Sequence, residues 1–249
     1  MAEAEKLFAA GQFTQAIPKA ESSLTVYPER KVAVREFQDR ARVRRDELNM
    51  IRVPAQPCWI GSDDRDDEKP ARQITLRAFR IDKYEVTNEE YLAFVTATDR
   101  PAPPYWSGRK FPKGRDRHPV VYVTWADAEA YAAWAGKRIP TAEEWEVAAR
   151  GPDRREYPWG SVFAEKENVF PCNCLEFWQV SKTKSQSPPV PVTTPVDQFD
   201  AANGSSPWGV QGMGGNVWEW TSTEIPRKDK PGAAPFRVVK GGSFMTPER

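Results

Sequence analysis

Histidine, cysteine and long apolar runs are scarce in this 249-residue sequence. It contains one histidine, His118, and three cysteines, Cys58, Cys172 and Cys174. A single histidine excludes an iron site built from three histidines and the usual histidine-based zinc sites. An odd and small number of cysteines argues against a disulfide framework.

Membrane and nucleic-acid functions are also disfavoured by what the sequence lacks. No apolar run approaches the roughly 18 residues that a membrane-spanning helix needs. The first residues are charged and lack the apolar core of a secretion signal, so we expect a cytoplasmic protein without a membrane segment. Acidic and basic residues are interspersed, with a formal net charge of +1, and no basic stripe predicts binding to nucleic acid.

Proline is abundant but unevenly distributed, which indicates two regions. Only Pro18 and Pro28 of the 23 prolines lie before residue 50. Residues 1–50 have apolar positions at helical spacing, and the pattern that begins at Leu7-Phe8 resembles a tetratricopeptide helix pair. One such pair cannot bury both faces without a neighbour, and a plain helical linker is the alternative. We predict an all-α, tetratricopeptide-like segment over 1–50 and a second domain over 51–249.

The second domain has the texture of short strands, loops and capped helices. Thr87 and Thr141 open capping boxes, and Thr124 is followed by an aspartate in the first turn of a third expected helix. Residues 73–84 alternate between apolar and polar positions, which predicts one strand. The ten tryptophans favour an irregular fold anchored by large aromatic side chains. Three of them stand at helix or strand spacing and are expected in the core: Trp145, Trp218 and Trp220.

Several motifs occur in the order that is typical of one protein family. They are Phe79-Arg-Ile-Asp-Lys-Tyr-Glu-Val-Thr-Asn88, Pro119-Val-Val-Tyr-Val-Thr-Trp125, Trp134-Ala-Gly-Lys-Arg-Ile-Pro-Thr141, Tyr157-Pro-Trp-Gly160, Gly215-Asn-Val-Trp-Glu-Trp220 and Lys240-Gly-Gly-Ser-Phe244. On these motifs, residues 51–249 resemble the sulfatase-modifying-factor domain of the formylglycine-generating-enzyme family. The resemblance implies an α+β variant of the C-type-lectin fold, irregular, with several helices and few short strands.

The oxidases of this family imply a copper site that this sequence does not reproduce. In that branch, two cysteines after the Gly-Gly-Ser segment bind Cu(I), because soft thiolates suit this ion. Thr246 stands at the first position, and the second would lie beyond Arg249, where we expect the domain to be truncated. An alcohol is a poor ligand for Cu(I), so copper is not expected. Ser243 matches a serine near the oxidase's active centre, and without the cysteines we interpret it as a turn residue.

Calcium is the metal that the resemblance favours. One family site is similar to Gly212, Gly215, Val217 and Glu219. The first three residues would offer backbone carbonyls and Glu219 a carboxylate, which are the hard oxygen ligands that Ca²⁺ prefers. The alternative is that Glu219 accepts hydrogen bonds from the loop's N–H groups without a metal. A second and weaker candidate site would begin at Asn168-Val169.

The remaining cysteines and the histidine allow several interpretations. Cys172 and Cys174 lie two residues apart, and such thiols can be soft-metal ligands, a redox pair or ordinary loop thiols. We favour loop thiols, because no partner cysteine or histidine is evident in the sequence. Cys58 is expected in the core, and His118 is expected to be a surface or structural residue rather than a catalytic base.

The family includes several activities, so its fold does not settle function. Oxidases convert a sulfatase cysteine to formylglycine with copper and O₂, whereas other members are accessory domains of iron-dependent sulfoxide synthases or ligand-binding domains, some fused to bacterial signalling kinases. Thr246 favours a non-catalytic module for an unidentified protein or small-molecule ligand, within a larger signalling protein. The formylglycine-generating oxidase is the alternative. An iron-oxygenase partner is disfavoured because residues 1–50 contain no histidine.

Overall fold

The computed structural model describes residues 1–30, 32–34, 36–38, 41, 49–66, 68–163, 170–183, 192–199, 204–230 and 232–247. In this part of the chain the fold mixes helices with a few short strands. The helices are α1 (Ala2–Ala9), α2 (Phe13–Val26), α4 (Asn88–Thr98), α5 (Trp125–Trp134), α6 (Ala142–Arg150) and α7 (Leu175–Thr183), with a 3-10 turn η1 (Pro28–Arg30). The strands are β1 (Met50–Val53), β2 (Pro57–Ile60), β3 (Arg72–Thr75), β4 (Phe79–Asp82), β5 (Glu219–Ile225) and β6 (Phe236–Lys240).

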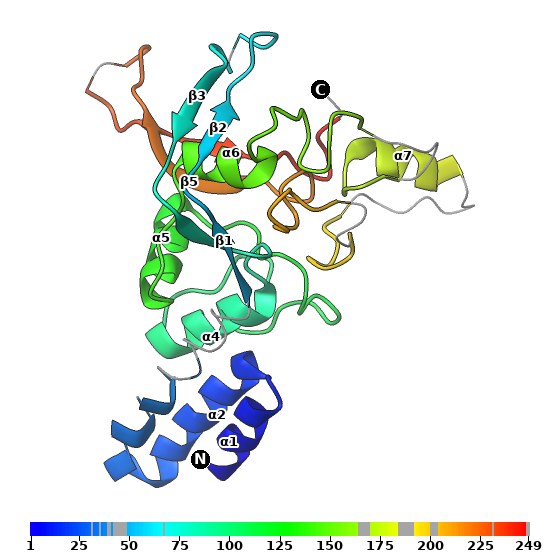
Figure 1. Ribbon diagram of the computed structural model, residues 1–249. Helices are drawn as coiled ribbons and strands as arrows, with labels where there is room; N and C mark the ends of the chain where they lie inside the picture. Colours follow the sequence, from blue (N-terminus) through cyan, green and yellow to red (C-terminus); the bar gives the residue numbers. More distant parts are fainter. Residues whose placement is uncertain are drawn as a thin grey trace.

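The N-terminal helices form one end of the molecule, and the β2–β3 hairpin lies at the other (Figure 1). The apolar faces of α1 and α2 are buried together with a following helical stretch that contributes Val34, Phe37 and Ala41. That stretch is the neighbour that an isolated helix pair would lack. On its other side α2 packs against α4, where Gln15 is hydrogen-bonded to Glu89.

The strands pair as three separate two-stranded antiparallel sheets within the described residues: β1 with β4, β2 with β3, and β5 with β6. The prediction of one strand over 73–84 is therefore wrong. The chain leaves the sheet of β3 after Thr75 and enters that of β4 at Phe79. The strands that pair with them are interrupted in the same way, because Pro54 ends β1 before β2 begins. Alternation continues across the break, but strand pairing does not.

The predicted helix starts at Thr87, Thr124 and Thr141 are confirmed. Each threonine accepts a hydrogen bond from a backbone N–H three residues later and closes a full capping box. Gly151 ends α6 as expected. No helix among the described residues is both long and apolar enough to cross a membrane.

Two core clusters hold the larger domain together. The first lies between α6 and the strands β1 and β2, and it buries Trp145 (6% exposed) and Cys58 (1% exposed), as predicted. The second joins α4 and α5 through the aromatic rings of Tyr91, Phe94 and Tyr131. Trp218 does not follow the prediction. It is 47% exposed and lies outside the sheet, because β5 begins only at the next residue, Glu219.

Candidate functional site

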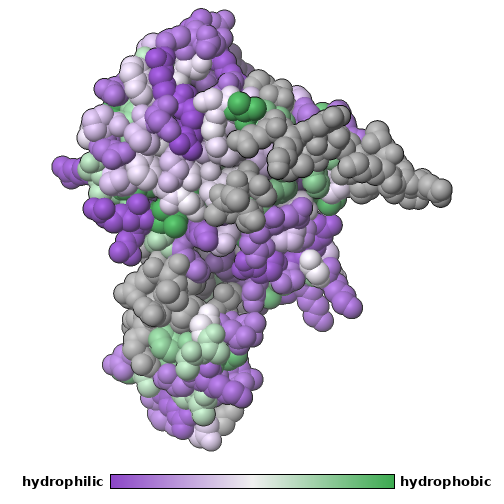
Figure 2. Space-filling model, turned by 45° about the vertical axis from the view of Figure 1, so that its right-hand side comes forward, coloured by the Kyte–Doolittle hydropathy of each residue, from purple (hydrophilic) through white to green (hydrophobic). Residues whose placement is uncertain are grey.

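A cleft of about 860 Å³ opens beside α6. Its walls come from α6, the loops near residues 61–68 and 154–163, the glycine-rich segment before β5, and the turn after β6. Most of the molecular face in Figure 2 is hydrophilic, with apolar residues in small separate patches. Because the apolar patches on that face are small and separate, the cleft is the better candidate for a functional site.

The turn at the end of the cleft contains both residues that the sequence places at the family's active-site positions. The Ser243 N–H donates to Thr246 Oγ1 at 2.9 Å, and the Thr246 N–H donates to the Ser243 carbonyl at 2.9 Å. The two side-chain oxygens lie 3.1 Å apart. The Thr246 hydroxyl is thus engaged in closing its own turn.

Asn216 organises the glycine-rich segment from a buried position. Its Nδ2 donates to Glu85 Oε1 at 2.8 Å, and its Oδ1 accepts from Asn173 Nδ2 at 3.0 Å and from the Thr194 N–H at 2.9 Å. Its φ of 58° places it in the left-handed region, which asparagine tolerates better than most residues. One side chain therefore joins segments that are far apart in the sequence.

Glu85, which is buried, and Glu219, which is half-buried, form an acidic pair next to this segment. Burial raises the pKa of Glu85 to about 7, although the Asn216 hydrogen bond acts in the opposite direction. Burial and then repulsion by Glu85 raise the pKa of Glu219 to about 8, against the hydrogen bond that Trp145 Nε1 donates at 3.0 Å. Glu85 Oε2 is buried and accepts no hydrogen bond from the described part of the chain. Two carboxylates in this setting require a proton or a cation.

Of the predicted calcium residues, Glu219 belongs to this pair and Gly212 lies against the Glu85 carboxylate. Gly212 and Gly215 have φ of 73° and 78°, and a Cβ at Gly212 would collide with the Glu85 carboxylate. The glycine-rich segment before β5 therefore meets the acidic pair at Gly212, next to Glu85. Sequence reasoning missed Glu85, although an acid flanked by apolar residues in the Tyr84-Glu-Val motif was a usable signal. The weaker candidates Asn168 and Val169 lie outside the described residues.

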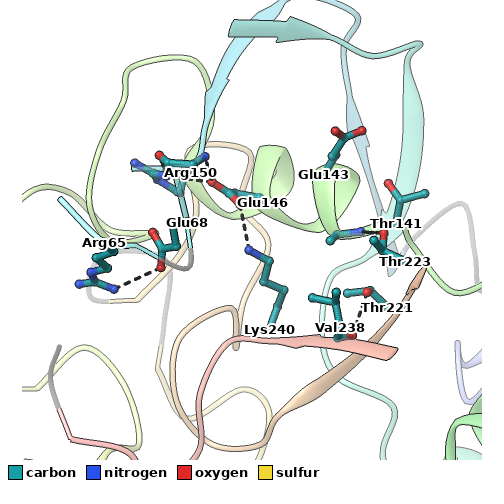
Figure 3. A network of polar contacts seen from close by, with 12 residues as sticks. Arg65, Glu68, Thr141, Glu143, Glu146, Arg150, Thr221, Thr223, Val238 and Lys240 are labelled. Atoms are coloured by element: carbon teal, nitrogen blue, oxygen red, sulfur yellow. Dashed lines mark hydrogen bonds and ion pairs between the residues drawn. The ribbon is translucent and has the colours of Figure 1, made fainter. Parts of the chain in front are cut away.

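A second polar network crosses the cleft wall (Figure 3). Glu146 on α6 accepts from Arg150 at 2.9 Å and from Lys240 of β6 at 2.9 Å. It also accepts from the Gly61 N–H at 2.6 Å. Burial alone would raise the pKa of Glu146, but Lys240 and these hydrogen bonds lower it. This network ties α6, β6 and the loop after β2 together.

His118 is placed as a structural residue, as predicted. It is 8% exposed, and its Nδ1 lies 3.0 Å from Arg115 and 3.0 Å from Thr193 Oγ1. Burial and the Arg115 charge lower the pKa of His118, which favours the neutral ring. Its carbonyl accepts from the Asn88 N–H at the start of α4, so it supports that helix.

Known proteins are similar to this chain in sequence and in fold. A family model described as "Sulfatase-modifying factor enzyme 1-like domain" matches residues 9–249. The formylglycine-generating enzyme of Thermomonospora curvata is 34% identical, with 80% of this chain and 83% of the relative covered. The mouse formylglycine-generating enzyme is 32% identical, and the match covers 79% of this chain and 66% of the relative.

Inactive relatives are similar at the same level. The bovine protein named "Inactive C-alpha-formylglycine-generating enzyme 2" is 32% identical, with 80% of this chain and 77% of the relative covered.

The crystal structure of CarF aligns with a TM-score of 0.52 at 21% identity, over 80% of this chain and 88% of that chain. The fold and motifs therefore define a sulfatase-modifying-factor domain. The chain belongs to the formylglycine-generating-enzyme family.

Proposed function

We propose that this domain is a non-catalytic binding module that holds a polypeptide segment in its cleft. The observation that carries this proposal is Thr246. It stands where the oxidases have a copper-binding cysteine, and its hydroxyl is hydrogen-bonded to Ser243. A neutral alcohol does not provide the soft, anionic sulfur that Cu(I) needs. The formylglycine-generating oxidase is the second candidate, favoured by the names of the active relatives.

The lining of the cleft supports a polypeptide ligand. Trp218 offers a half-exposed aromatic face, and Tyr157 stacks on Trp159 with ring centroids 5.5 Å apart. Charges of both signs line the same cleft, including Asp63 and Arg154, which form an ion pair at 3.1 Å. Aromatic anchors with a polar rim are typical of surfaces that bind peptides. A compact apolar ligand would contact the aromatic residues of the cleft but not its charged residues.

Two peptides test the proposal. One carries the sulfatase-type cysteine motif, and the other has serine in place of that cysteine. We expect both to bind with similar affinity in a fluorescence titration and Trp218→Ala to weaken both about tenfold, since one buried aromatic contact is worth about 1–2 kcal/mol. Mass spectrometry after incubation with Cu(I) and O₂ should find no aldehyde. Aldehyde formation would refute the non-catalytic role, and binding of neither peptide would refute peptide recognition.

We further propose that calcium occupies the acidic pair. Glu85 and Glu219 would supply carboxylate oxygens, and Gly212, Gly215 and Val217 would supply carbonyls. The buried, unpartnered Oε2 of Glu85 and the raised pKa values of both carboxyl groups support this fit. When bound, the ion would neutralise the pair and fasten the glycine-rich segment that leads into β5.

The wider architecture belongs to the same proposal. We infer that residues 51–249 adopt a variant of the C-type-lectin fold, which the short strands and extensive loops support. We infer that residues 1–50 are a tetratricopeptide-like contact segment, which the shared burial of α1, α2 and Phe37 supports. Such a pairing of a helical segment with a binding domain suits a bacterial signalling protein.

A further inference from the structure

Two charged loops contribute to the lining of the cleft. The β2 loop (residues 61–66 and 68) follows strand β2, and the α6 loop (residues 151–158) follows helix α6. Their charged residues that line the cleft are Asp63, Asp64, Arg65, Glu68, Arg154 and Glu156. Because the loops come from separate elements, the contacts between them decide how closely the two parts of the lining are held together.

The two loops are joined by two ion pairs of opposite polarity. Asp63 of the β2 loop pairs with Arg154 at 3.1 Å, and Arg65 of the β2 loop pairs with Glu156 at 3.5 Å. All four side chains are between 31% and 63% exposed. Exposed ion pairs are individually weak and are screened by salt, so this junction is easily broken.

Opening the junction leaves both β2-loop side chains with a partner in their own part of the chain. Asp63 Oδ1 also accepts from the Ala71 N–H at 3.1 Å, and Arg65 also pairs with Glu68 at 3.4 Å. The free-energy cost of separating the loops is therefore smaller than the cost of leaving lone charges behind.

Arg154 is the residue at which the α6 loop depends most on these contacts. Its φ of 60° lies in the left-handed region, which is unfavourable for most side chains. Its guanidinium lies 4.4 Å from the centre of the Trp59 ring, in addition to its pair with Asp63. The backbone at Arg154 can relax when the junction opens, because the contacts that hold this conformation come from the opposite loop and from β2.

The bases of both loops are fixed by less exposed contacts (Figure 3). The Gly61 N–H donates to Glu146 at 2.6 Å, and the Gly61 carbonyl accepts from Arg150 at 2.9 Å. Arg150 Nε also donates to the Arg155 carbonyl at 2.7 Å. The side chains of Glu146 and Arg150 are only 12% and 16% exposed, so salt screens these contacts less. Fixed bases and an exposed junction together make a device that can open without unfolding.

We propose that the β2 and α6 loops form an ionic clasp that controls access to the cleft. With both ion pairs formed, the loops are held together across the lining. When salt screens the pairs, or when a ligand replaces them with contacts of its own, the loops separate about their fixed bases. This inference rests on the proposed binding function for the ligand, but the opening of the clasp can be measured without one.

Cys172 and Cys174 provide a probe of the opening that needs no ligand. Both are free cysteines that line the cleft, and each is only 4% exposed. The full chain is treated with a bulky fluorescent maleimide, and peptide mapping follows the labelling rate of these two thiols. We expect Asp63→Asn/Glu156→Gln to be labelled about fivefold faster than the unaltered protein at low salt, because two weak pairs are lost together. High salt should bring the unaltered protein close to the rate of this double variant, whose own rate should hardly change.

Asp229→Asn is the matched control, because it removes a carboxylate from an exposed ion pair, that with Arg227, which does not line the cleft. It should be labelled like the unaltered protein at both salt concentrations. Cys58 lies in the core, is 1% exposed and reports general unfolding, so its labelling should stay slow throughout.

Three results would overturn the clasp: equal labelling of the double variant and the unaltered protein at low salt, no effect of salt on the unaltered protein, or a parallel rise in the labelling of Cys58. The proposed binding function is judged separately by the peptide titration. Peptide binding with unchanged labelling would refute the clasp alone. The expected labelling without any peptide binding would refute the binding function and leave the clasp standing.

Discussion

At the scale of single residues, the acidic pair Glu85 and Glu219 is the most unusual chemistry of the described chain. Buried carboxyl groups are stable only when they are protonated, paired or bound to a cation. The unpartnered Oε2 of Glu85 shows that hydrogen bonds from the described residues do not satisfy the pair. This arrangement predicts that the stability of the domain depends on pH and, through the proposed calcium site, on calcium.

The pair predicts a stability that falls as pH rises when calcium is removed. Both folded pKa values, about 7 for Glu85 and about 8 for Glu219, lie above the ordinary value of 4.5. The folded state therefore holds protons that the unfolded chain has released, and this advantage is lost as pH rises from about 4.5 through about 8. Calcium favours the ionised pair, so its stabilisation should increase over the same range. Thermal unfolding with a chelator or with calcium, at several pH values, measures both trends.

Two substitutions distinguish the pH and calcium dependence of the acidic pair from the effect of removing any carboxylate. Glu85→Gln should remove most of the pH dependence and most of the calcium response. Glu129→Gln is the matched control, because Glu129 is exposed on α5 and should behave like the unaltered protein. Stability that instead rises with pH in the chelator would contradict the prediction, as would a full calcium response in Glu85→Gln.

At the scale of elements, α6 links the core to the cleft. Its inner face buries Trp145, whose Nε1 reaches Glu219, and Glu146 of the same helix joins β6 through Lys240. The helix is nine residues long, so its start matters for its stability. Thr141 accepts from the Glu144 N–H at 3.1 Å, and Glu144 accepts from the Thr141 N–H at 3.0 Å.

Loss of this cap should destabilise the fold measurably. Thr141→Ala should lower the free energy of unfolding by about 1 kcal/mol, because the Glu144 N–H loses the side-chain hydroxyl that accepts its hydrogen bond. Thr141→Ser should retain most of the stability, since it keeps the hydroxyl. Thr75→Ala, at an exposed position of β3, serves as the control and should change the free energy by less than about 0.5 kcal/mol. Denaturant unfolding would refute the capping role if Thr141→Ala matched the control.

At the scale of the whole molecule, the N-terminal helices have an apolar cluster of their own, separate from the clusters behind the cleft. Phe37 is fully buried there, with its ring 5.6 Å from that of Phe8. The link to the larger domain runs through α2 and α4, which pack against each other. Changes in this cluster should therefore act independently of the cleft.

Phe37→Ala should lower stability by about 3–5 kcal/mol, because it removes a buried ring and leaves a cavity. The increase in melting temperature that we expect from calcium should stay the same, since Phe37 belongs to a separate core cluster and sites that share no partners contribute additively. Val32→Ala is the control, with a side chain that is 69% exposed on the same helical stretch. Calorimetry that showed a lost calcium response in Phe37→Ala would contradict this independence.

Local features were predictable from the sequence for a physical reason. A capping box is formed by residues three apart, so Thr87, Thr124 and Thr141 announce their helices without help from the rest of the fold. Burial of Cys58 and Trp145 followed from their apolar character. The break between β3 and β4 was not predictable from alternation, because pairing depends on which strand lies alongside. The predicted calcium ligands, the domain boundary and a cytoplasmic location remain predictions.

The sequence by itself determined the family and the helix starts, and it predicts that Thr246 stands at the position of a copper-binding cysteine. These are matters of residue identity and short-range spacing. Only the tertiary structure brought Glu85 to Glu219 across more than a hundred residues, exposed Trp218 in the cleft, and set the Cys172–Cys174 pair beside the Thr246 turn. Burial and electrostatic coupling arise from chain segments that meet in space, so no local pattern could have shown them.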